Sequence, residues 1–162
     1  MRKCLIVVLL PLLMLGCGAK ETFETVADEL VAPAMAQPRQ VSVRLPEDAV
    51  APVLDSDSQQ VYLCEDYEIV VEILEAGDLQ ETVRHISGYG KDALTVMETF
   101  LDGISRYEFV WACAGETEDR IGRAVILDDG EYHYCLSVLR DASTTENSQI
   151  VWEDVFSSFT LT

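Results

Sequence analysis

The sequence is poor in positive charge. It holds 11 lysine and arginine residues against 29 aspartate and glutamate residues, a formal net charge of −18 at pH 7. Binding to nucleic acid needs clustered lysines and arginines that contact phosphates, so the composition argues against a nucleic-acid partner. The excess of carboxylates favours a soluble, exposed surface and leaves a cationic or protein partner open.

Histidine is also scarce, and the sequence shows no catalytic constellation. His85 and His133 are the two histidines of the chain. The turn SGYG at residues 87–90 lacks the preceding strand and the residue order of a nucleophile elbow, and it indicates a helix end. We therefore expect no enzyme and no catalytic residue. A small extracytoplasmic hydrolase stays as an alternative, which an exposed His133 beside a thiol would favour and a buried His133 would disfavour.

The apolar run near the start is too short to cross a bilayer, which needs about 20 residues. Residues 5–15 form this run, and Pro11 interrupts it. Arg2 and Lys3 precede it. A short positive segment followed by an apolar core of about 7–15 residues predicts a secretory signal peptide. An Ala-x-Ala-like cleavage site does not follow the run.

The run ends instead at Met14-Leu15-Gly16-Cys17. This tetrad resembles the bacterial lipobox, Leu-x-Gly/Ala-Cys, with Met14 in the place of the usual leucine. The resemblance implies a signal peptide of residues 1–16, cleavage between Gly16 and Cys17, and diacylglycerol on the Cys17 thiol. We expect a lipid-anchored protein on the extracytoplasmic face of a bacterial cell membrane, since about two acyl chains give a stable anchor. A soluble secreted protein cut near Gly18 or Ala19 is the alternative.

Cleavage at this site would make the mature chain more acidic. Nine basic and 29 acidic residues would remain, a formal charge of 9 − 29 = −20. Anionic lipid headgroups repel such a chain, so the lipid on Cys17 would have to hold the protein at the membrane by itself.

Three further cysteines follow Cys17 in the mature chain. Cys64, Cys113 and Cys135 lie in strand-like apolar stretches, where a free thiol behaves as a small buried hydrophobe. A disulfide from Cys113 or Cys64 to Cys135 stays open. His133 and Cys135 share a strand face, but in a plain meander a strand separates Cys113 from Cys135 by about two 4.8 Å spacings. That distance disfavours a shared metal site, so we expect the thiols to pack in the core.

Acidic residues gather in four places, of which the best metal candidate is a predicted turn. Calcium takes six to eight oxygen ligands, often from acidic loops. None of the four clusters has the glycine and terminal glutamate of a defined calcium loop. We therefore expect no metal and no cofactor, and name as weak metal candidates Asp128, Asp129 and Glu131.

Composition and prolines divide the mature chain at about residue 37. Residues 17–37 are predicted to be a tether that includes an amphipathic helix, because apolar residues recur there at helical spacing. Pro33 and Pro38 end that helix. Residues 38–162 are predicted to form a single α+β globular domain. The apolar residues of the tether helix are Phe23, Val26, Ala27, Leu30 and Val31.

Hydrophobic periodicity predicts the elements of this domain. Residues 49–60 indicate a loop. Asp78 and Glu81 form a capping box at the start of a helix that ends near Gly88. A second helix is predicted over 146–156, and strands over 41–45, 61–64, 67–74, 94–100, 106–114, 123–128, 131–139 and 159–161.

Two patterns in these strands make sharper predictions. The run YEFVWACA at residues 107–114 is apolar on both faces, which predicts an interior strand covered on both sides. Asp129-Gly130 between two β-rich runs predicts a hairpin with a two-residue turn. With that turn, Asp128 pairs with Glu131 and Ile126 pairs with His133.

The order of the elements, strands followed by a helix, an antiparallel meander and a second helix, is an α+β pattern. The run GRAVILDDGEYHYCLSVLRDA, followed by WEDVFSSFTL at residues 152–161, resembles the C-terminal half of PsbP/Mog1-like domains. The resemblance covers residues 107–162 best. Together these features predict an antiparallel β-sheet flanked by helices on both faces, an α/β/α sandwich. The resemblance implies a small, often membrane-tethered binding or assembly-assisting domain.

We therefore expect a membrane-anchored surface lipoprotein with a non-catalytic binding or structural domain. A binding module for a cationic solute, a peptide or calcium is the first alternative, because the mature chain is strongly acidic. The small hydrolase is the second.

Overall fold

The computed structural model describes residues 36–115, 118–143 and 147–162, with side chains of the last segment from Trp152 onward. The predicted signal peptide, Cys17 and nearly all of the 17–37 tether lie outside these residues. The described residues belong to one compact unit, Met35–Thr162. None of the helices found in them is long and apolar enough to span a bilayer.

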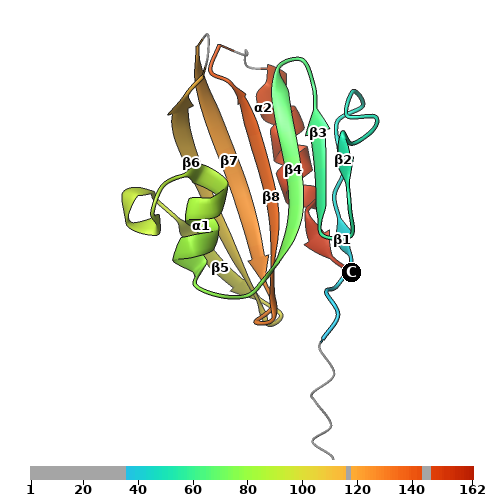
Figure 1. Cartoon of the computed structure of the whole chain (residues 1–162), viewed down its shortest axis with the longest axis vertical. Helices are drawn as coiled ribbons and strands as arrows, with labels where there is room; N and C mark the ends of the chain where they lie inside the picture. Colours follow the sequence, from blue (N-terminus) through green and yellow to red (C-terminus); the bar gives the residue numbers. More distant parts are fainter. Residues whose placement is uncertain (1–35, 116–117, 144–146) are drawn as a thin grey trace, which may run out of the picture. The chain divides into compact units, whose positions relative to one another are not determined.

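An antiparallel sheet of seven strands is the centre of this unit (Figure 1), in the order β2-β3-β4-β8-β7-β6-β5. A separate two-stranded sheet pairs β1 with β9, and both of its strands have two residues. The predicted loop at 49–60 contains β2 and the start of β3. The strands are β1 Val41–Ser42, β2 Leu54–Asp55, β3 Gln59–Leu63, β4 Tyr67–Glu75, β5 Met97–Leu101, β6 Ile104–Ala114, β7 Asp119–Asp128, β8 Tyr132–Asp141 and β9 Thr160–Leu161.

The turn between β7 and β8 begins one residue later than predicted. The Asp129 N–H donates to the Tyr132 carbonyl over 3.3 Å, so Gly130 and Glu131 are the two turn residues. Gly130 has φ of 92°, and glycine at the first turn position is typical of a type II′ hairpin. Asp129 Oδ1 also accepts the N–H groups of Glu131 (3.0 Å) and Tyr132 (2.9 Å), which fixes Asp129 before the turn.

This turn shifts the predicted pairing of the two strands by two residues. Asp128 pairs with His133 and Ile126 pairs with Cys135, so the predicted pairs Asp128–Glu131 and Ile126–His133 are wrong. Because successive side chains of a strand alternate between faces, a shift of two leaves every side chain on the face that was predicted.

The first helix, α1, spans Leu79–Ser87 and has the predicted ends. Asp78 is its N-cap, with Oδ1 accepting the Gln80 N–H at 2.9 Å. Gly88 ends it in the left-handed region at φ 78°. A short 3₁₀ turn, η1 Lys91–Ala93, follows. Through Val83, α1 packs on one face of the sheet, in a cluster with Phe109, Trp111, Ala124, Ile126 and Cys135.

The second helix, α2, spans Asn147–Ser158 and packs on the opposite face. Its buried side chains Trp152, Val155 and Phe156 join the larger cluster of the protein, and Phe159 extends the contact just after the helix. The sheet residues of this cluster come mainly from β4, β7 and β8, among them Ile69, Val71, Val125, Leu136 and Val138.

The prediction of an α/β/α sandwich is wrong, because the described residues are mostly β. They contain nine strands and two α-helices, of 9 and 12 residues. One short helix contacts each face, and neither face carries a helical layer. The reason lies in the connections: from Met97 to Asp141 the chain runs through four strands without an intervening helix.

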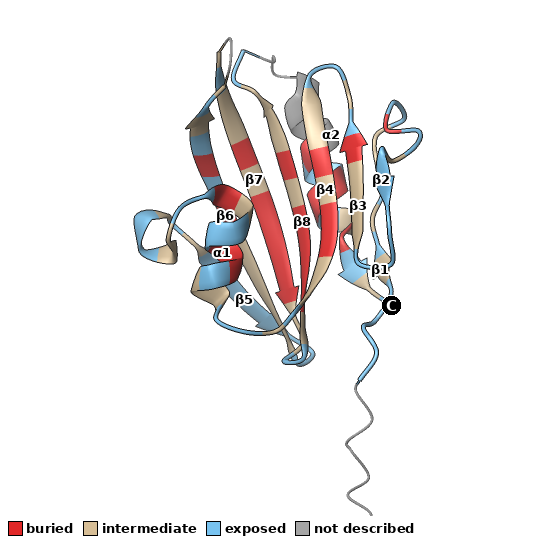
Figure 2. Ribbon diagram, viewed as in Figure 1, coloured by how far each residue is buried: buried red, intermediate tan, exposed pale blue. Residues whose placement is uncertain are grey.

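The prediction that residues 107–114 are covered on both faces is also wrong. Phe109 and Trp111 are 2% and 7% exposed, whereas Val110 between them is 56% exposed. Phe109 and Trp111 point to the α1 face, and Val110 points to the α2 face. The buried residues of the cluster around α2 do not include any from β6, and Figure 2 shows burial concentrated on β4, β7 and β8. The α2 face of β6 is therefore open beside the helix.

Candidate functional site

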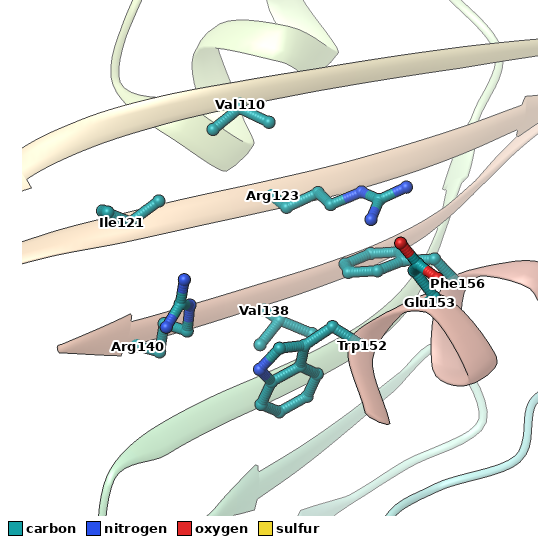
Figure 3. A pocket seen from close by; sticks show the side chains of 8 residues that line it. All are labelled: Val110, Ile121, Arg123, Val138, Arg140, Trp152, Glu153 and Phe156. Carbon is teal, nitrogen blue, oxygen red and sulfur yellow. The ribbon is translucent and has the colours of Figure 1, made fainter. Parts of the chain in front are cut away.

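A cavity of about 340 Å³ lies beside α2, on the uncovered part of this face (Figure 3). Ligand pockets in proteins usually measure about 300–1,000 Å³ and are mostly apolar, with a few polar groups that orient the ligand. This cavity, which we call the α2 groove, has that size, and apolar and polar surface share its lining about equally. It is lined by Val110, Ile121, Arg123, Val138, Arg140, Trp152, Glu153 and Phe156.

Strand pairing brings the sheet residues of the groove together. Val110 on β6 pairs with Arg123 on β7, which pairs with Val138 on β8, so the three form one row across the sheet. Ile121 and Arg140 are paired in the neighbouring row. Residues two apart in a strand point to the same face, so both rows face α2.

Arg123 is held in place by two contacts inside the protein. Its Nη2 donates to Glu108 Oε2 at 3.1 Å, and its guanidinium carbon lies 4.4 Å from the centre of the Phe156 ring. A guanidinium over an aromatic face is attracted by the ring quadrupole. The ion pair and the ring contact fix the guanidinium at the junction of β7 and α2.

Glu108 accepts hydrogen bonds from both Arg123 and Arg106. Arg106 Nε donates to Glu108 Oε1 at 2.8 Å, and Arg106 Nη2 donates to the Phe156 carbonyl at 2.9 Å, near the end of α2. Burial alone would raise the pKa of Glu108. The hydrogen bonds from Arg106 and Arg123 outweigh burial and hold the pKa below its usual range. Glu108 is therefore ionised at neutral pH and joins the two arginines.

Trp152 contributes an unsatisfied hydrogen-bond donor to the groove wall. The residue is 7% exposed, and its ring meets Tyr67 edge-on at 4.8 Å. Its Nε1 is buried and has no hydrogen-bond partner among the described residues. In Figure 3 the nitrogen lies on the side of the ring that faces Arg140. A buried donor without an acceptor costs about 1–3 kcal/mol, so this N–H calls for an acceptor from elsewhere.

The charges around the groove are unlike those of the chain as a whole. The described lining of the groove holds two guanidinium groups, those of Arg123 and Arg140, and one carboxylate, that of Glu153. The whole chain carries 29 acidic residues against 11 basic ones. The groove lining thus has a higher proportion of basic side chains than the chain as a whole.

His133, a candidate of the sequence analysis, lies on the other face and is 1% exposed. Its Nδ1 is 2.8 Å from Thr82 Oγ1, and its Nε2 is 3.6 Å from Asp128 Oδ2. A hydroxyl, an imidazole and a carboxylate in line have the residue types of a nucleophilic triad. Thr82 and His133 are nevertheless packed between α1 and the sheet, where a substrate does not reach them. This burial disfavours the hydrolase alternative.

The three cysteines are all free thiols and lie apart from the groove. Cys135 is 1% exposed, and burial raises the pKa of its thiol well above the usual value, with a further rise from the Glu72 carboxylate. A thiol with a raised pKa is a poor nucleophile and a poor metal ligand. Cys135 and the partly buried Cys113 pack in the cluster under α1.

The acidic turn keeps its carboxylates occupied within the protein. Besides the two turn N–H groups, Asp129 accepts the Tyr134 hydroxyl at 2.9 Å. Burial raises the pKa of Asp129, but the N–H groups of Tyr132 and Glu131 outweigh it, and the pKa is lowered. Asp128 Oδ1 accepts the Gly130 N–H at 2.8 Å. The described part of the chain brings no three acidic, histidine or cysteine side chains together as a metal site, and Glu131 is exposed.

Neither Arg123 and Arg140 nor Trp152 was singled out from the sequence as a candidate site residue. Trp152 is buried, but its N–H is unpaired. A signal was present in the sequence: two of the few arginines stand among apolar residues of adjacent strands. Recognising that they share a face required the register of β7 and β8.

No family model matches the chain, and no curated protein matches it. The lipobox and the PsbP/Mog1-like resemblance therefore stay predictions, and the chemistry of the groove has to be argued from its own residues.

Proposed function

We propose that this protein is a lipoprotein of the extracytoplasmic face of a bacterial cell membrane, anchored by lipid on Cys17. Its compact unit is a non-catalytic module that binds a small molecule in the α2 groove. The observation that carries the proposal is the buried Trp152 Nε1, which has no partner among the described residues, in the wall of an open groove with both apolar and charged side chains. The PsbP/Mog1-like resemblance of residues 107–162 supports a small, membrane-tethered binding domain.

The composition of the groove supports binding rather than catalysis. Arginine is always protonated in proteins, so Arg123 and Arg140 hold and orient a ligand but do not exchange protons with it. The eight lining residues that the structure describes include no histidine, cysteine, serine or threonine. Glu153 is the one carboxylate among the described lining residues, and a single carboxylate gives no acid–base pair.

A cationic ligand, the alternative drawn from the acidic composition, has weaker support. A second cavity beside β1 collects Glu47, Asp48 and Asp154, but it also contains Arg44. Within the described residues these carboxylates do not converge as a metal site. We therefore place this alternative second.

The anchor can be tested directly. Mass spectrometry of the mature N-terminus is expected to find an acylated Cys17, and Cys17→Ser is expected to release the protein from the membrane fraction. The long acyl chains carry the binding, at about 0.8 kcal/mol for each buried CH₂. An unmodified N-terminus at another residue, or a Cys17→Ser protein that stays in the membrane fraction, would contradict the anchor.

The groove can be tested with three probes that share one apolar body: 3-phenylpropanoate, 3-phenylpropan-1-ol and 3-phenylpropylamine. Equilibrium dialysis against the lipidated protein in nanodiscs, with empty nanodiscs as the blank, is expected to show saturable binding of at least one probe. Val110→Trp fills the lip of the groove from an exposed position and is expected to weaken that binding.

Val53→Trp is the matched control, since Val53 is 62% exposed and does not line the groove. Failure of all three probes to bind, or equal binding to the two variants, would contradict the proposed site.

A further inference from the structure

The strand β5 ends the central sheet with an edge that no other described strand pairs with. The order of the seven strands places β5 at one edge and β2 at the other (Figure 1). β2 has two residues, and so short an edge strand offers little to a second chain. β5 has five residues, all of them exposed, and they pair with β6 in a continuous register. The outer N–H and C=O groups of β5 are therefore a template for another strand.

The side chains of β5 do not protect this edge. Met97, Phe100 and Leu101 are 62%, 70% and 73% exposed. Proteins usually guard an edge strand with lysine, proline or a bulge, and β5 has none of these. Glu98 is its one charged residue. A strand that pairs with β5 would remove apolar surface from water, which favours the pairing.

The turn after β5 determines which backbone groups of the strand bond to β6. Asp102 and Gly103 form this turn and have φ of 53° and 81°, both positive, as in a two-residue type I′ hairpin. Such a turn closes on a hydrogen-bonded pair, which here is Leu101 with Ile104. Leu101 therefore uses its backbone groups within the hairpin.

The backbone groups of the other β5 residues follow from this pair. In an antiparallel sheet, successive residues of a strand turn their N–H and C=O groups alternately to the neighbour on either side. Counting back from Leu101, Thr99 and Met97 also bond to β6. The outward groups of β5 are those of Glu98 and Phe100, and a further strand has to pair with these two residues.

A second copy of β5 can pair antiparallel with these groups in three registers, which differ in where the carboxylates lie. With the two-fold axis at Glu98, the two Glu98 carboxylates lie opposite each other. With the axis at Phe100, Glu98 lies opposite Asp102 of the second copy. With the axis at Thr99, Glu98 lies opposite Phe100, and Asp102 lies opposite Val96. Like charges directly opposite destabilise a strand pair, so the Thr99 register alone suits this acidic chain.

We propose that β5 is a self-association surface, through which two copies of this chain pair their β5 strands antiparallel about a two-fold axis at Thr99. Glu98 and Phe100 exchange N–H···O=C hydrogen bonds across the axis, and Met97 lies opposite Leu101 of the second copy. The two-fold contact uses the free β5 edge of both copies, so the assembly closes as a dimer. No β5 residue belongs to the described lining of the α2 groove, so the pairing does not depend on the proposed function.

A disulfide across the axis tests the pairing and its register. In the proposed dimer the two Thr99 residues form a non-hydrogen-bonded pair with Cα atoms about 4.5 Å apart, within the range that a disulfide spans. Mild oxidation of cells that express full-length Thr99→Cys is expected to give a product of twice the chain mass on a non-reducing gel. Leu101→Cys is the matched control, because its two thiols would lie about 13 Å apart along the strands.

A mixture of two variants gives a second readout of the register. Met97→Cys and Leu101→Cys place thiols opposite each other only when one copy carries each substitution. Co-expression of the two variants with different tags is expected to give a cross-linked product that carries both tags. Either variant alone is expected to give no more dimer than the unchanged protein, which reports the background from the native thiols.

Charge at position 100 tests the contact with Glu98 of the second copy. In a Thr99→Cys background, Phe100→Glu is expected to lower the yield of dimer several-fold, because two carboxylates would then lie opposite each other. Phe100→Lys is expected to retain the yield, since its ammonium would face a carboxylate. Phe100 is 70% exposed, so the two variants should fold equally well.

Several results would overturn the proposal. One is a Thr99→Cys protein that forms no more dimer than Leu101→Cys, and another is a product whose mass shows a different partner chain. A mixture of Met97→Cys and Leu101→Cys that cross-links no more than either variant alone would exclude the Thr99 register. Equal yields from Phe100→Glu and Phe100→Lys, or a larger loss with lysine, would contradict the pairing of Phe100 with Glu98.

Discussion

The two faces of the central sheet are built from alternate residues of the same strands, yet one is closed and the other is open. On the α1 face, Trp111 lies against Gly122 on the neighbouring strand, and the buried His133 and Thr82 satisfy each other. On the α2 face, the buried Trp152 N–H has no partner among the described residues, and a groove lies beside it. Both tryptophans are 7% exposed, so exposure alone does not reveal the difference.

The groove lies where α2 stops covering the sheet. The buried cluster around α2 draws its sheet residues mainly from β4, β7 and β8, and from β6 only the partly buried Ile104 packs against it. The same strand buries Phe109 and Trp111 on the other face. An apolar strand covered on one side only leaves hydrocarbon beside polar groups, which is the usual character of a ligand site. Substitutions that act on one face should therefore separate packing from binding.

The largest expected effect comes from deleting one aromatic ring on each face. Phe109→Ala and Phe156→Ala each remove a ring that is almost fully buried, so each should lower the free energy of unfolding by about 3–5 kcal/mol. Urea denaturation of the two variants measures this. At concentrations of urea where both stay folded, only Phe156→Ala should weaken probe binding, because Phe156 lines the groove. Equal loss of binding in both variants would contradict the separation of the two faces.

The next effect comes from Gly122 on the α1 face. A Cβ at this position would overlap the indole ring of Trp111, so Gly122→Ala should lower the free energy of unfolding by about 1–3 kcal/mol through overpacking. Gly77→Ala is the matched control, because a Cβ at Gly77 meets open space, and it should change stability by less than about 0.5 kcal/mol. Thermal or urea denaturation measures both variants. A Gly122→Ala protein as stable as the Gly77→Ala control would show that the packing of Trp111 does not require a glycine at position 122.

A smaller effect is expected from the buried polar pair under α1. Thr82→Val keeps the shape of the side chain but leaves His133 Nδ1 without its partner at 2.8 Å, so stability should fall by about 1–2 kcal/mol. Thr82→Ser retains the hydroxyl and should be milder. If denaturation shows that valine is tolerated better than serine, the Thr82–His133 bond does not stabilise the α1 face.

The smallest effect concerns pH and the α2 face. The pKa of Glu108 is lowered in the folded protein, so its ionised form stabilises the fold above the ordinary value of 4.5. As the pH falls from 4.5 through the lowered pKa of the folded protein, this contribution to the free energy of unfolding should be lost. Unfolding curves between pH 3 and pH 6 should show a smaller loss for Glu108→Gln than for the unchanged protein. Identical pH profiles would indicate that the ion pairs of Glu108 with Arg106 and Arg123 add no stability.

Local features of the fold could be predicted from the sequence, because they depend on neighbouring residues. Asp78 and Gly88 bound α1 as expected, since capping depends on one side chain and one backbone angle. The β7–β8 hairpin was found, but its turn was placed one residue early, because Asp129 accepts two N–H groups and sits before the turn. Residues 107–114 were correctly assigned to a strand within the seven-stranded sheet.

The features that failed depend on contacts between distant segments. An apolar strand does not reveal how far a helix some 40 residues later will cover it. The predictions that Val110 is covered and that the fold is an α/β/α sandwich were therefore both wrong. The groove needs the pairing of Ile121 with Arg140 and of Val110 with Arg123, and the sequence pattern did not fix that register. Trp152 was not singled out, because a missing acceptor for its N–H can be recognised only from its surroundings.

The central claim is that the Trp152 N–H, unpartnered among the described residues, is a donor of a ligand-binding groove. With ¹⁵N-tryptophan labelling, the chain gives two indole signals by nuclear magnetic resonance, from Trp111 and Trp152, and Trp111→Phe assigns them. Addition of 3-phenylpropanoate to the lipidated protein in nanodiscs is predicted to shift the Trp152 indole proton downfield, as expected for a new hydrogen bond to a carboxylate, and to leave the Trp111 signal in place. A Trp152 signal that does not move at saturating probe, or a shift of the Trp111 signal instead, would contradict the account.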